Sequence, residues 1–203
     1  MKILVTGFDP FGGEAINPAY EVLKLLPKTI GDAQLRVLEI PTVFYASYQV
    51  LAAEIKGFMP DLVLCVGQAG GRSALSFEKV AINLNDARIK DNQGQQFVDT
   101  PIVAEGQTAY FTNLPIKAMV EAVKAAGIPA MVSYTAGTYV CNHIFYQLMH
   151  GIATEFPEIR GGFLHVPYCE AQVVAKPMEP SMSLASIAKG IEVALEEIGR
   201  AHV

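Results

Sequence analysis

Long apolar runs are missing from this sequence, and their absence excludes several classes of protein. No stretch of eighteen or more apolar residues occurs, so no membrane-spanning helix is expected. The apolar stretch that follows Lys2 is interrupted at Gly7, which makes it too short for the core of a secretion signal. We therefore expect residues 2–6 to form a buried first strand rather than a leader.

Charged residues are also few. They make up 17% of the 203 residues, the net charge is −5, and no stripe of basic residues is present, which argues against a nucleic-acid partner. Apolar residues account for 51% of the chain, which is atypical of disorder and sufficient for a substantial core. A chain of this length is expected to be one domain, residues 1–203.

Only three cysteines are present, namely Cys65, Cys141 and Cys169. This odd number lacks the spacing of a disulfide framework or of a zinc site, and it fits a reducing, cytoplasmic setting. Cys65 lies within the continuous apolar segment 61–67, so it is expected to be a core residue.

Short apolar segments alternate with helical patterns along the whole chain. This alternation predicts an α/β fold of three layers, in which a mostly parallel, twisted open sheet carries helices on both faces, as in phosphorylase- and hydrolase-like proteins. Residues 76–84 alternate with a period of two and follow the preceding strand after a short loop. This segment is therefore expected to be the one strand that runs antiparallel in an otherwise parallel sheet. The expected strands are 2–6, 35–40, 61–67, 76–84, 129–134 and 162–167, and the expected helices start near residues 17, 42, 113, 141 and 183.

Cys141 stands where a predicted buried strand turns through a glycine-containing loop into the predicted helix 141–156. Unpaired N–H groups and the positive end of the helix dipole at that place stabilise an anion, so the pKa of the thiol is expected to fall below its usual value of about 8.5. The same N–H groups could hold an oxyanion. Cys141 is therefore a candidate nucleophile, and the competing interpretation is an inert cysteine of the core.

A cysteine nucleophile needs a base and a group that orients the base. His165 lies near the carboxyl end of the predicted strand 162–167, where open α/β sheets bind their ligands. Glu78 shares the parity of Val80 and Ile82, and a carboxylate on an apolar face requires a partner. We predict that Glu78 orients His165. The alternative is that Glu78 reaches water at a sheet edge or forms a structural ion pair with an arginine.

The other three histidines fit the role of base less well. His143 lies two positions from Cys141 on the same predicted helix, so it should point to a different face. His150 and His202 come late in predicted helices and are expected to be exposed.

Two loops rich in small or polar residues remain. Residues 67–72 (Gly-Gln-Ala-Gly-Gly-Arg) follow a predicted strand, but they match neither the dinucleotide fingerprint nor the P-loop, so they are a weak phosphate signal. Residues 85–112 form the longest polar segment, which is typical of a functional lid or a subunit contact.

Five blocks resemble those of one known family, in the same order along the chain. They are residues 6–13 (Thr-Gly-Phe-Asp-Pro-Phe-Gly-Gly) with Asn17-Pro18, 67–72 with 78–83 (Glu-Lys-Val-Ala-Ile-Asn), 85–89 (Asn-Asp-Ala-Arg-Ile), 135–143 (Thr-Ala-Gly-Thr-Tyr-Val-Cys-Asn-His) and 162–167 (Gly-Phe-Leu-His-Val-Pro). The sequence resembles pyroglutamyl-peptidase I, also called pyrrolidone-carboxylate peptidase, over nearly its whole length. The resemblance implies a cytoplasmic cysteine peptidase that removes N-terminal pyroglutamate, commonly as a homotetramer, without metal or cofactor.

The resemblance also implies a role for individual residues. Cys141 would be the nucleophile, His165 the base and Glu78 its orienter, in agreement with the roles inferred from position and parity. Arg88 would belong to the oxyanion region. Because pyroglutamate is a small neutral lactam, its pocket is expected to combine apolar walls with one donor and one acceptor. The residues implied in substrate binding are Phe8 and Phe11 beside the ring, Gln68 at the lactam, and Asn17, Thr42, Ile89, Tyr139 and Val140 elsewhere in the pocket.

Two other functions remain open on the sequence. One is a phosphorylase-like enzyme of similar architecture that uses residues 67–72 to bind phosphate, and a phosphate or nucleoside ligand would then stabilise the protein against heat. The other is a non-enzymatic binding protein, in which no thiol would react unusually fast near neutral pH.

Overall fold

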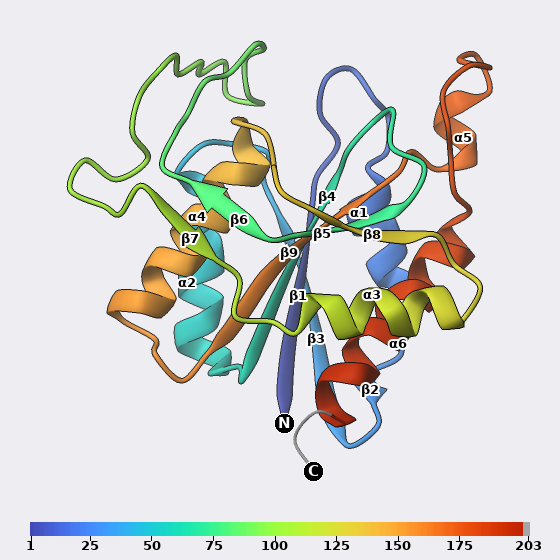
Figure 1. The fold of residues 1–203 in the computed structure, drawn as a ribbon. Coiled ribbons are helices and arrows are strands. Elements are labelled where there is room, and N and C mark those ends of the chain that lie inside the picture. Colours follow the sequence, from blue (N-terminus) through green and yellow to red (C-terminus); the bar gives the residue numbers. More distant parts are fainter. Residues whose placement is uncertain (201–203) are drawn as a thin grey trace.

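A seven-stranded sheet forms the centre of the molecule in the computed structural model, which describes residues 1–200 (Figure 1). Its strand order is β2-β3-β1-β4-β9-β5-β8, and a separate pair, β6-β7, lies beside it. The four neighbours β3, β1, β4 and β9 are parallel, whereas β5 runs antiparallel to β9 and parallel to β8. The strands are β1 (Lys2–Phe8), β2 (Thr29–Ile30), β3 (Ala33–Ile40), β4 (Leu62–Gln68), β5 (Leu75–Glu78), β6 (Val80–Ile82), β7 (Ala109–Phe111), β8 (Ala130–Ser133) and β9 (Arg160–Val166).

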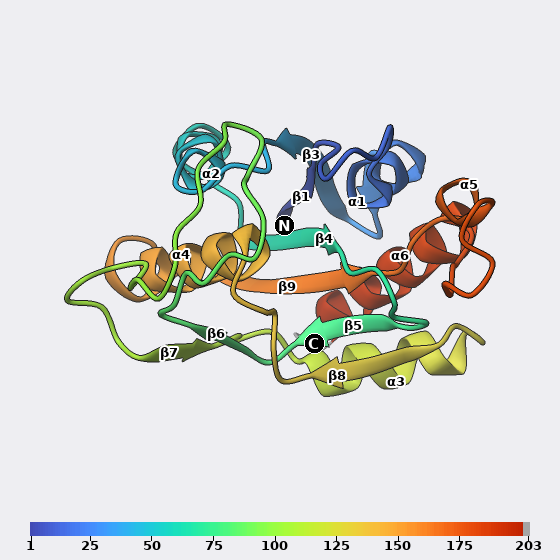
Figure 2. The same ribbon diagram turned by 90° about the horizontal axis from the view of Figure 1, so that it is seen from above.

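Helices cover both faces of this sheet, as Figure 2 shows from above. One face packs against α2 and α4, and the other packs against α1, η1, α3 and α6. The predicted α/β fold with a mostly parallel sheet and helices on both faces is confirmed. The helices are α1 (Pro18–Glu21), η1 (Val22–Leu25), α2 (Ala46–Phe58), α3 (Ile116–Ala125), α4 (Val140–Thr154), α5 (Glu170–Val173) and α6 (Leu184–Arg200).

Local sequence signals explain several of these elements. Asn17 caps α1, because its Oδ1 accepts a hydrogen bond from the N–H of Ala19 at 3.0 Å, and Pro18 occupies the first helical position. β4 is buried along its whole length between the two helical layers, as its continuous apolar run predicts. No helix within residues 1–200 is both long enough and apolar enough to cross a membrane.

The prediction of one continuous strand over residues 76–84 is wrong, because the strand is interrupted at Lys79. β5 belongs to the main sheet and is antiparallel to β9, as expected, whereas β6 leaves that sheet and pairs with β7. Lys79 is the turning point, since its N–H donates to the carbonyl of Ser133 at 2.7 Å and its carbonyl accepts from the N–H of Thr112 at 3.1 Å. The predicted strand 129–134 also differs, because β8 lies at the sheet edge and leaves Met131 49% exposed rather than buried.

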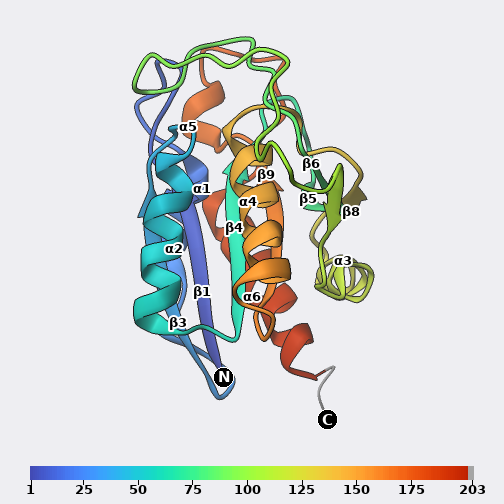
Figure 3. The ribbon, with the colours of Figure 1, turned by 90° about the vertical axis from the view of Figure 1, so that its left-hand side faces the viewer.

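The carboxyl ends of β1, β4 and β9 lie at one edge of the sheet, where most of the long loops gather at the top of Figure 3. Residues 83–108 contribute most of this layer and contain no regular helix or strand. α4 begins at the same edge and runs down the face of β4 and β9 (Figure 3). Ligand sites in open α/β sheets form outside the carboxyl ends of the strands, so this edge is where a site is expected.

Candidate active site

The imidazole of His165 and the carboxylate of Glu78 meet inside the protein. β9 carries His165 one residue before its end, and the antiparallel neighbour β5 carries Glu78 as its last residue. The Nδ1–H of His165 donates to Oε1 of Glu78 at 2.7 Å, because an ionised carboxylate only accepts. Glu78 is 0% exposed, so it does not reach solvent at an edge. The structure therefore brings the predicted base and its predicted orienter together.

Arg72 also binds Glu78, and the sequence did not identify it. Its Nη1 donates to the same Oε1 of Glu78 at 2.7 Å, and its Nη2 donates to the carbonyl of Thr135 at 3.0 Å. The structural alternative for Glu78, an ion pair with an arginine, is thus present together with the histidine contact. No local signal singled out Arg72, because an arginine that ends a glycine-rich loop is usually solvated. It joins the loop after β4, the end of β5 and the loop that leads into α4.

The electrostatics favour an ionised carboxylate beside a neutral ring. Burial opposes the charge of Glu78, but the hydrogen bonds that it accepts from His165 and Arg72 outweigh burial, and the pKa of Glu78 is lowered. Burial also lowers the pKa of His165, against the opposing influence of Glu78, and the positive charge of Arg72 lowers it further. At neutral pH, His165 is therefore uncharged and holds its proton on Nδ1, which leaves Nε2 free to accept one.

Cys141 occupies the second position of α4, at a helix start that no side chain caps. Its sulfur lies against Gly67, because a Cβ built on Gly67 would stand 2.8 Å from Sγ of Cys141 and 2.7 Å from Cζ of Phe163. Gly67 faces His165 across the parallel pairing of β4 and β9. The thiol thus stands over the strand next to that of the imidazole, although no hydrogen bond joins the two within residues 1–200. Only glycine leaves room for this approach.

The expected low pKa of the Cys141 thiol is wrong. Burial raises the pKa of Cys141 to about 12, and the negative charge of Glu78 raises it as well, while Arg72 opposes both. The loss of contact between the thiol and water thus raises its pKa more than the helix start, on which the expectation rested, lowers it. Burial thus favours the neutral thiol of Cys141 and the neutral imidazole of His165.

Residues 138–142 are tied to the segment 82–90 by a series of hydrogen bonds. The side chain of Asn142 accepts from the N–H of Ile82 at 3.0 Å and donates to the carbonyls of Ile82 and Leu84 at 2.9 and 3.0 Å. The hydroxyl of Thr138 donates to the carbonyl of Asp86 at 2.8 Å, and the N–H of Asp86 donates to the carbonyl of Thr138 at 3.0 Å. These bonds fix the start of α4, and with it the position of Cys141.

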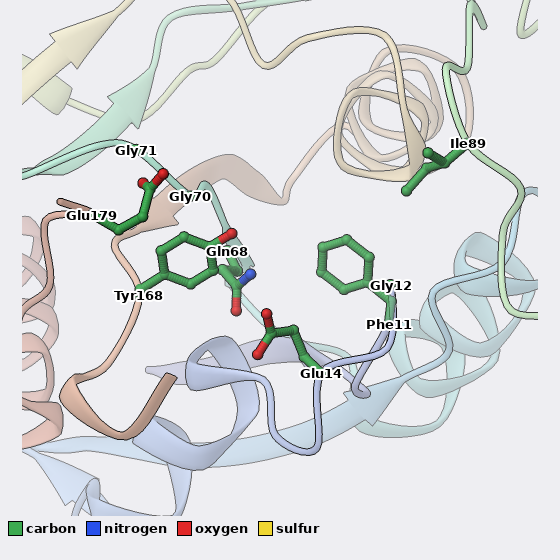
Figure 4. A pocket seen from close by; sticks show the side chains of 9 residues that line it. All are labelled: Phe11, Gly12, Glu14, Gln68, Gly70, Gly71, Ile89, Tyr168 and Glu179. Carbon is green, nitrogen blue, oxygen red and sulfur yellow. The ribbon is translucent and has the colours of Figure 1, made fainter. Parts of the chain in front are cut away.

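Two adjoining cavities open at the carboxyl edge of the sheet. The first holds about 430 Å³, and Gln68 lies on its wall between the rings of Tyr168 and Phe11 (Figure 4). The second holds about 620 Å³ and is lined by Arg88, Tyr139 and residues of the loop before α4. Phe11 and Ile89 belong to the walls of both cavities, whereas Cys141, His165 and Glu78 line neither. Arg88 is exposed at the second cavity.

The remaining predicted pocket residues are buried and line neither cavity. Phe8 and Val140 are 2% and 0% exposed and belong to the core on the α4 side of the sheet. Asn17 uses its amide to cap α1 and to bond the carbonyl of Asp9 at 2.9 Å. Thr42 donates its N–H to Oδ1 of Asp9 at 2.7 Å and its hydroxyl to the carbonyl of Asp9 at 3.2 Å. Asn17 and Thr42 thus hold the loop after β1 in shape.

The other described histidines and Cys65 form no hydrogen bond with Cys141, His165 or Glu78. His143 is fully buried, and its ring bonds the N–H of Tyr45 and the side chain of Asn85 rather than any triad residue. His150 contacts the hydroxyl of Tyr110 at 2.9 Å, and His202 lies outside the described residues. Cys65 is fully buried, as predicted, and burial raises its pKa to about 12.

The glycine-rich loop 67–72 is occupied by the protein's own groups. Gly70 lies under the ring of Tyr168, where an added Cβ would stand 2.4 Å from Cζ. Gly67 makes room for the Cys141 sulfur, and Arg72 is bound to Glu78 and Thr135. These contacts give the loop a role in positioning Cys141 and Glu78, and none of them favours the phosphate-binding alternative.

A thiol, a buried imidazole and a buried carboxylate, gathered at the carboxyl edge of an open α/β sheet, are typical of cysteine hydrolases. Within residues 1–200, no group of three or more His, Cys, Asp or Glu side chains is arranged to hold a metal ion.

Comparison with known proteins identifies the family. The model of the pyroglutamyl peptidase family matches residues 1–201. Pyrrolidone-carboxylate peptidase 1 of Streptococcus pneumoniae is 60% identical over 198 residues, which are 98% of this chain and 92% of that protein. The corresponding Streptococcus pyogenes protein is 57% identical over 195 residues, which are 96% of this chain and 91% of that one. The chain belongs to the pyroglutamyl peptidase family, and the resemblance seen in its sequence is confirmed.

Solved structures agree with this result. The crystal structure of pyroglutamyl peptidase I from Bacillus amyloliquefaciens superposes with a TM-score of 0.95 at 51% identity, covering 98% of this chain and 97% of that one. A mutant pyrrolidone carboxyl peptidase from the hyperthermophile Pyrococcus furiosus gives a TM-score of 0.96 at 42% identity, with both chains covered completely. The chain is therefore a peptidase, and the non-enzymatic alternative is excluded.

Proposed function

We propose that this enzyme hydrolyses the bond after an N-terminal pyroglutamyl residue of peptides and proteins, through a triad of Cys141, His165 and Glu78 and a thioester intermediate. The observation that carries the triad is the 2.7 Å hydrogen bond between His165 Nδ1 and the buried Glu78. The names of the related peptidases support the substrate class.

The protonation states support a general-base mechanism. The Cys141 sulfur attacks the carbonyl of the pyroglutamyl residue while its proton moves to Nε2 of His165, and Glu78 stabilises the imidazolium that results. The tetrahedral intermediate then collapses to a thioester, and the imidazolium gives its proton to the departing amine. Water attacks the thioester in the second half of the reaction, with His165 again accepting a proton, and pyroglutamate and the free thiol are released.

The negative charge on the carbonyl oxygen requires donors close to the sulfur. The uncapped start of α4 supplies N–H groups that the helix itself does not use. Arg88, at the neighbouring cavity, is the proposed charged donor of this oxyanion region.

The substrate ring is proposed to bind beside Phe11, with Phe8 beneath it and Gln68 bonded to the lactam. The first cavity supports this assignment, because Phe11 and Gln68 both line it, together with Tyr168 and the carboxylates of Glu14 and Glu179. Proline lacks the lactam carbonyl and would leave the amide unpaired, so it should be rejected. The weaker assignments to the pocket are Asn17, Thr42, Ile89, Tyr139 and Val140.

The wider setting is part of the same proposal. We take residues 1–203 as one peptidase domain that works in the cytoplasm without a metal or cofactor. Three free cysteines support a reducing compartment. Association as a homotetramer is supported by large apolar side chains that remain exposed, such as Phe111 at 67% and Tyr134 at 68%.

Replacement of the nucleophile tests the proposal. Cys141→Ser should abolish release of a fluorescent amine from a pyroglutamyl amide, because a serine hydroxyl is a far weaker nucleophile beside a neutral imidazole. Cys65→Ala is the matched control, since it removes the fully buried thiol of β4, which has no part in the proposed triad, and it should keep most of the activity. Undiminished turnover by Cys141→Ser would exclude the thioester mechanism, and an inactive wild-type protein would exclude the substrate class.

A further inference from the structure

A chain of side-chain amides leads from α5 to the wall of the first cavity. Gln172 lies in α5 and is buried, with 7% of its surface exposed. Its Oε1 accepts the backbone N–H of Cys169 at 3.2 Å, and its Nε2 donates to Oε1 of Gln68 at 2.8 Å. Nε2 also faces Oε2 of Glu14 and the carbonyl of Ile16, each at 3.3 Å. Gln172 is thus bonded at both ends of its amide.

These partners fix which way each amide points. A backbone N–H can only donate, so the atom of Gln172 that faces Cys169 must be the oxygen. The nitrogen of Gln172 then faces Gln68, and the atom of Gln68 that receives this bond must also be the oxygen. One unambiguous backbone donor therefore sets the orientation of two side chains in series.

The consequence is a hydrogen-bond donor at the cavity wall. The Nε2 group of Gln68 has no partner within residues 1–200, and in Figure 4 it points toward the side of Phe11 while the oxygen points away. An amide that was free to rotate could offer either its oxygen or its nitrogen to a ligand. Held as it is here, it offers N–H, which is complementary to a carbonyl oxygen.

We propose that Gln172 is a positioning residue for substrate recognition, which holds the Gln68 amide so that its nitrogen donates to the lactam carbonyl of pyroglutamate. This inference rests on the proposed function, because it requires a lactam in the first cavity. Gln172 itself does not touch the ring; it acts through Gln68. The lactam carbonyl is the group that pyroglutamate has and proline lacks. The enzyme would recognise it with the Gln68 Nε2–H donor, which is oriented before the substrate binds.

Gln172→Met tests this role, because methionine fills a similar volume and forms neither bond. The KM for a pyroglutamyl reporter and the inhibition constant of 2-pyrrolidone, which carries the lactam but no scissile bond, should both rise roughly five- to tenfold, whereas kcat should change less than about twofold. Gln172→Glu provides a second variant, since its carboxylate still accepts from Cys169 but has no N–H for Gln68. Arg36→Met is the control: it removes the ion pair with Glu54, which involves no residue of this amide chain, and should alter neither constant.

A double-mutant cycle separates positioning from a purely structural effect. In the Gln68→Met background, Gln172→Met should add no further rise in KM or in the inhibition constant, because the group through which it acts is already gone. Additive losses, or an unchanged KM in both Gln172 variants while the wild type is active, would overturn the inference and leave the proposed function intact. A wild-type protein that neither hydrolyses the reporter nor binds 2-pyrrolidone would overturn both.

Discussion

Acid should weaken this protein through His143, two residues from the candidate nucleophile. The His143 ring is fully buried and its Nε2 accepts the N–H of Tyr45 at 3.0 Å, so the proton must sit on Nδ1, which donates to Oδ1 of Asn85 at 2.9 Å. Burial lowers the pKa of His143 from 6.5 to about 4. A charged ring would lose the acceptor at Nε2 and place two donors, Tyr45 N–H and the ring, face to face.

The size of the effect follows from proton linkage. In the unfolded chain His143 takes up a proton as the pH falls through 6.5, whereas in the folded protein it stays neutral until about pH 4. The stability supplied by the neutral ring is therefore fully present above pH 6.5 and is lost as the pH falls toward 4. The loss amounts to about 2 kcal/mol between pH 7 and pH 5, and to about 3 kcal/mol once the pH is below 4.

Comparison with His143→Gln isolates this contribution. Glutamine can still accept from Tyr45 but does not titrate, and His165, whose pKa is also lowered by burial, is common to both proteins. Because the chain has no tryptophan, urea unfolding should be followed by circular dichroism, at one fixed protein concentration. The free energy of unfolding of the wild type should fall about 2 kcal/mol more than that of the variant between pH 7 and pH 5. Equal pH dependence in the two proteins would refute the reasoning.

Three further outcomes concern the triad. Gly67→Ala should lower kcat/KM about a hundredfold with the fold retained, because its Cβ would stand 2.8 Å from the Cys141 sulfur and 2.7 Å from the Phe163 ring; near wild-type activity would contradict the close approach. Arg72→Gln should move the acid limb of the kcat/KM profile to higher pH, because it removes a charge that lowers the pKa of His165, and Arg72→Lys should move it less; an unmoved limb argues against the coupling. Alkylation of Cys141 by iodoacetamide, followed by mass spectrometry, should accelerate steadily beyond pH 9, because burial raises the thiol pKa to about 12; a plateau below pH 8 would instead indicate a stable thiolate.

The sequence predicts those features of the fold that depend on neighbouring residues. The buried strand β4 follows from a continuous apolar run, and the start of α1 follows from the Asn17-Pro18 cap. The break at Lys79 does not follow, because the period-two pattern continues on both sides of it and carries no information about which sheet a strand joins. The exposure of Met131 depends likewise on the position of β8 at the sheet edge, which is a property of the whole chain.

The candidate site divides in the same way. Local sequence patterns predict that Cys141 lies at a helix start and His165 near a strand end. The alternation of apolar residues around Glu78 was sufficient to predict that its carboxylate is buried and needs a partner. The role of Arg72 is not predicted by the sequence, because its contact with Glu78 depends on the tertiary structure. The direction of the thiol pKa was wrong for a related reason, since the helix start is visible in the sequence and the burial around the sulfur is not.

The hydrogen bonds between residues 138–142 and the segment 82–90 have a consequence for variation of the enzyme. The bonds join Thr138 and Asn142, on either side of Cys141 in the sequence, to residues 82–86, which precede Arg88, so a shift of one segment should move the other. Insertions or grafts aimed at changing peptide preference should therefore fail when placed within residues 82–90 or 138–142, because they would break these hydrogen bonds and displace the start of α4.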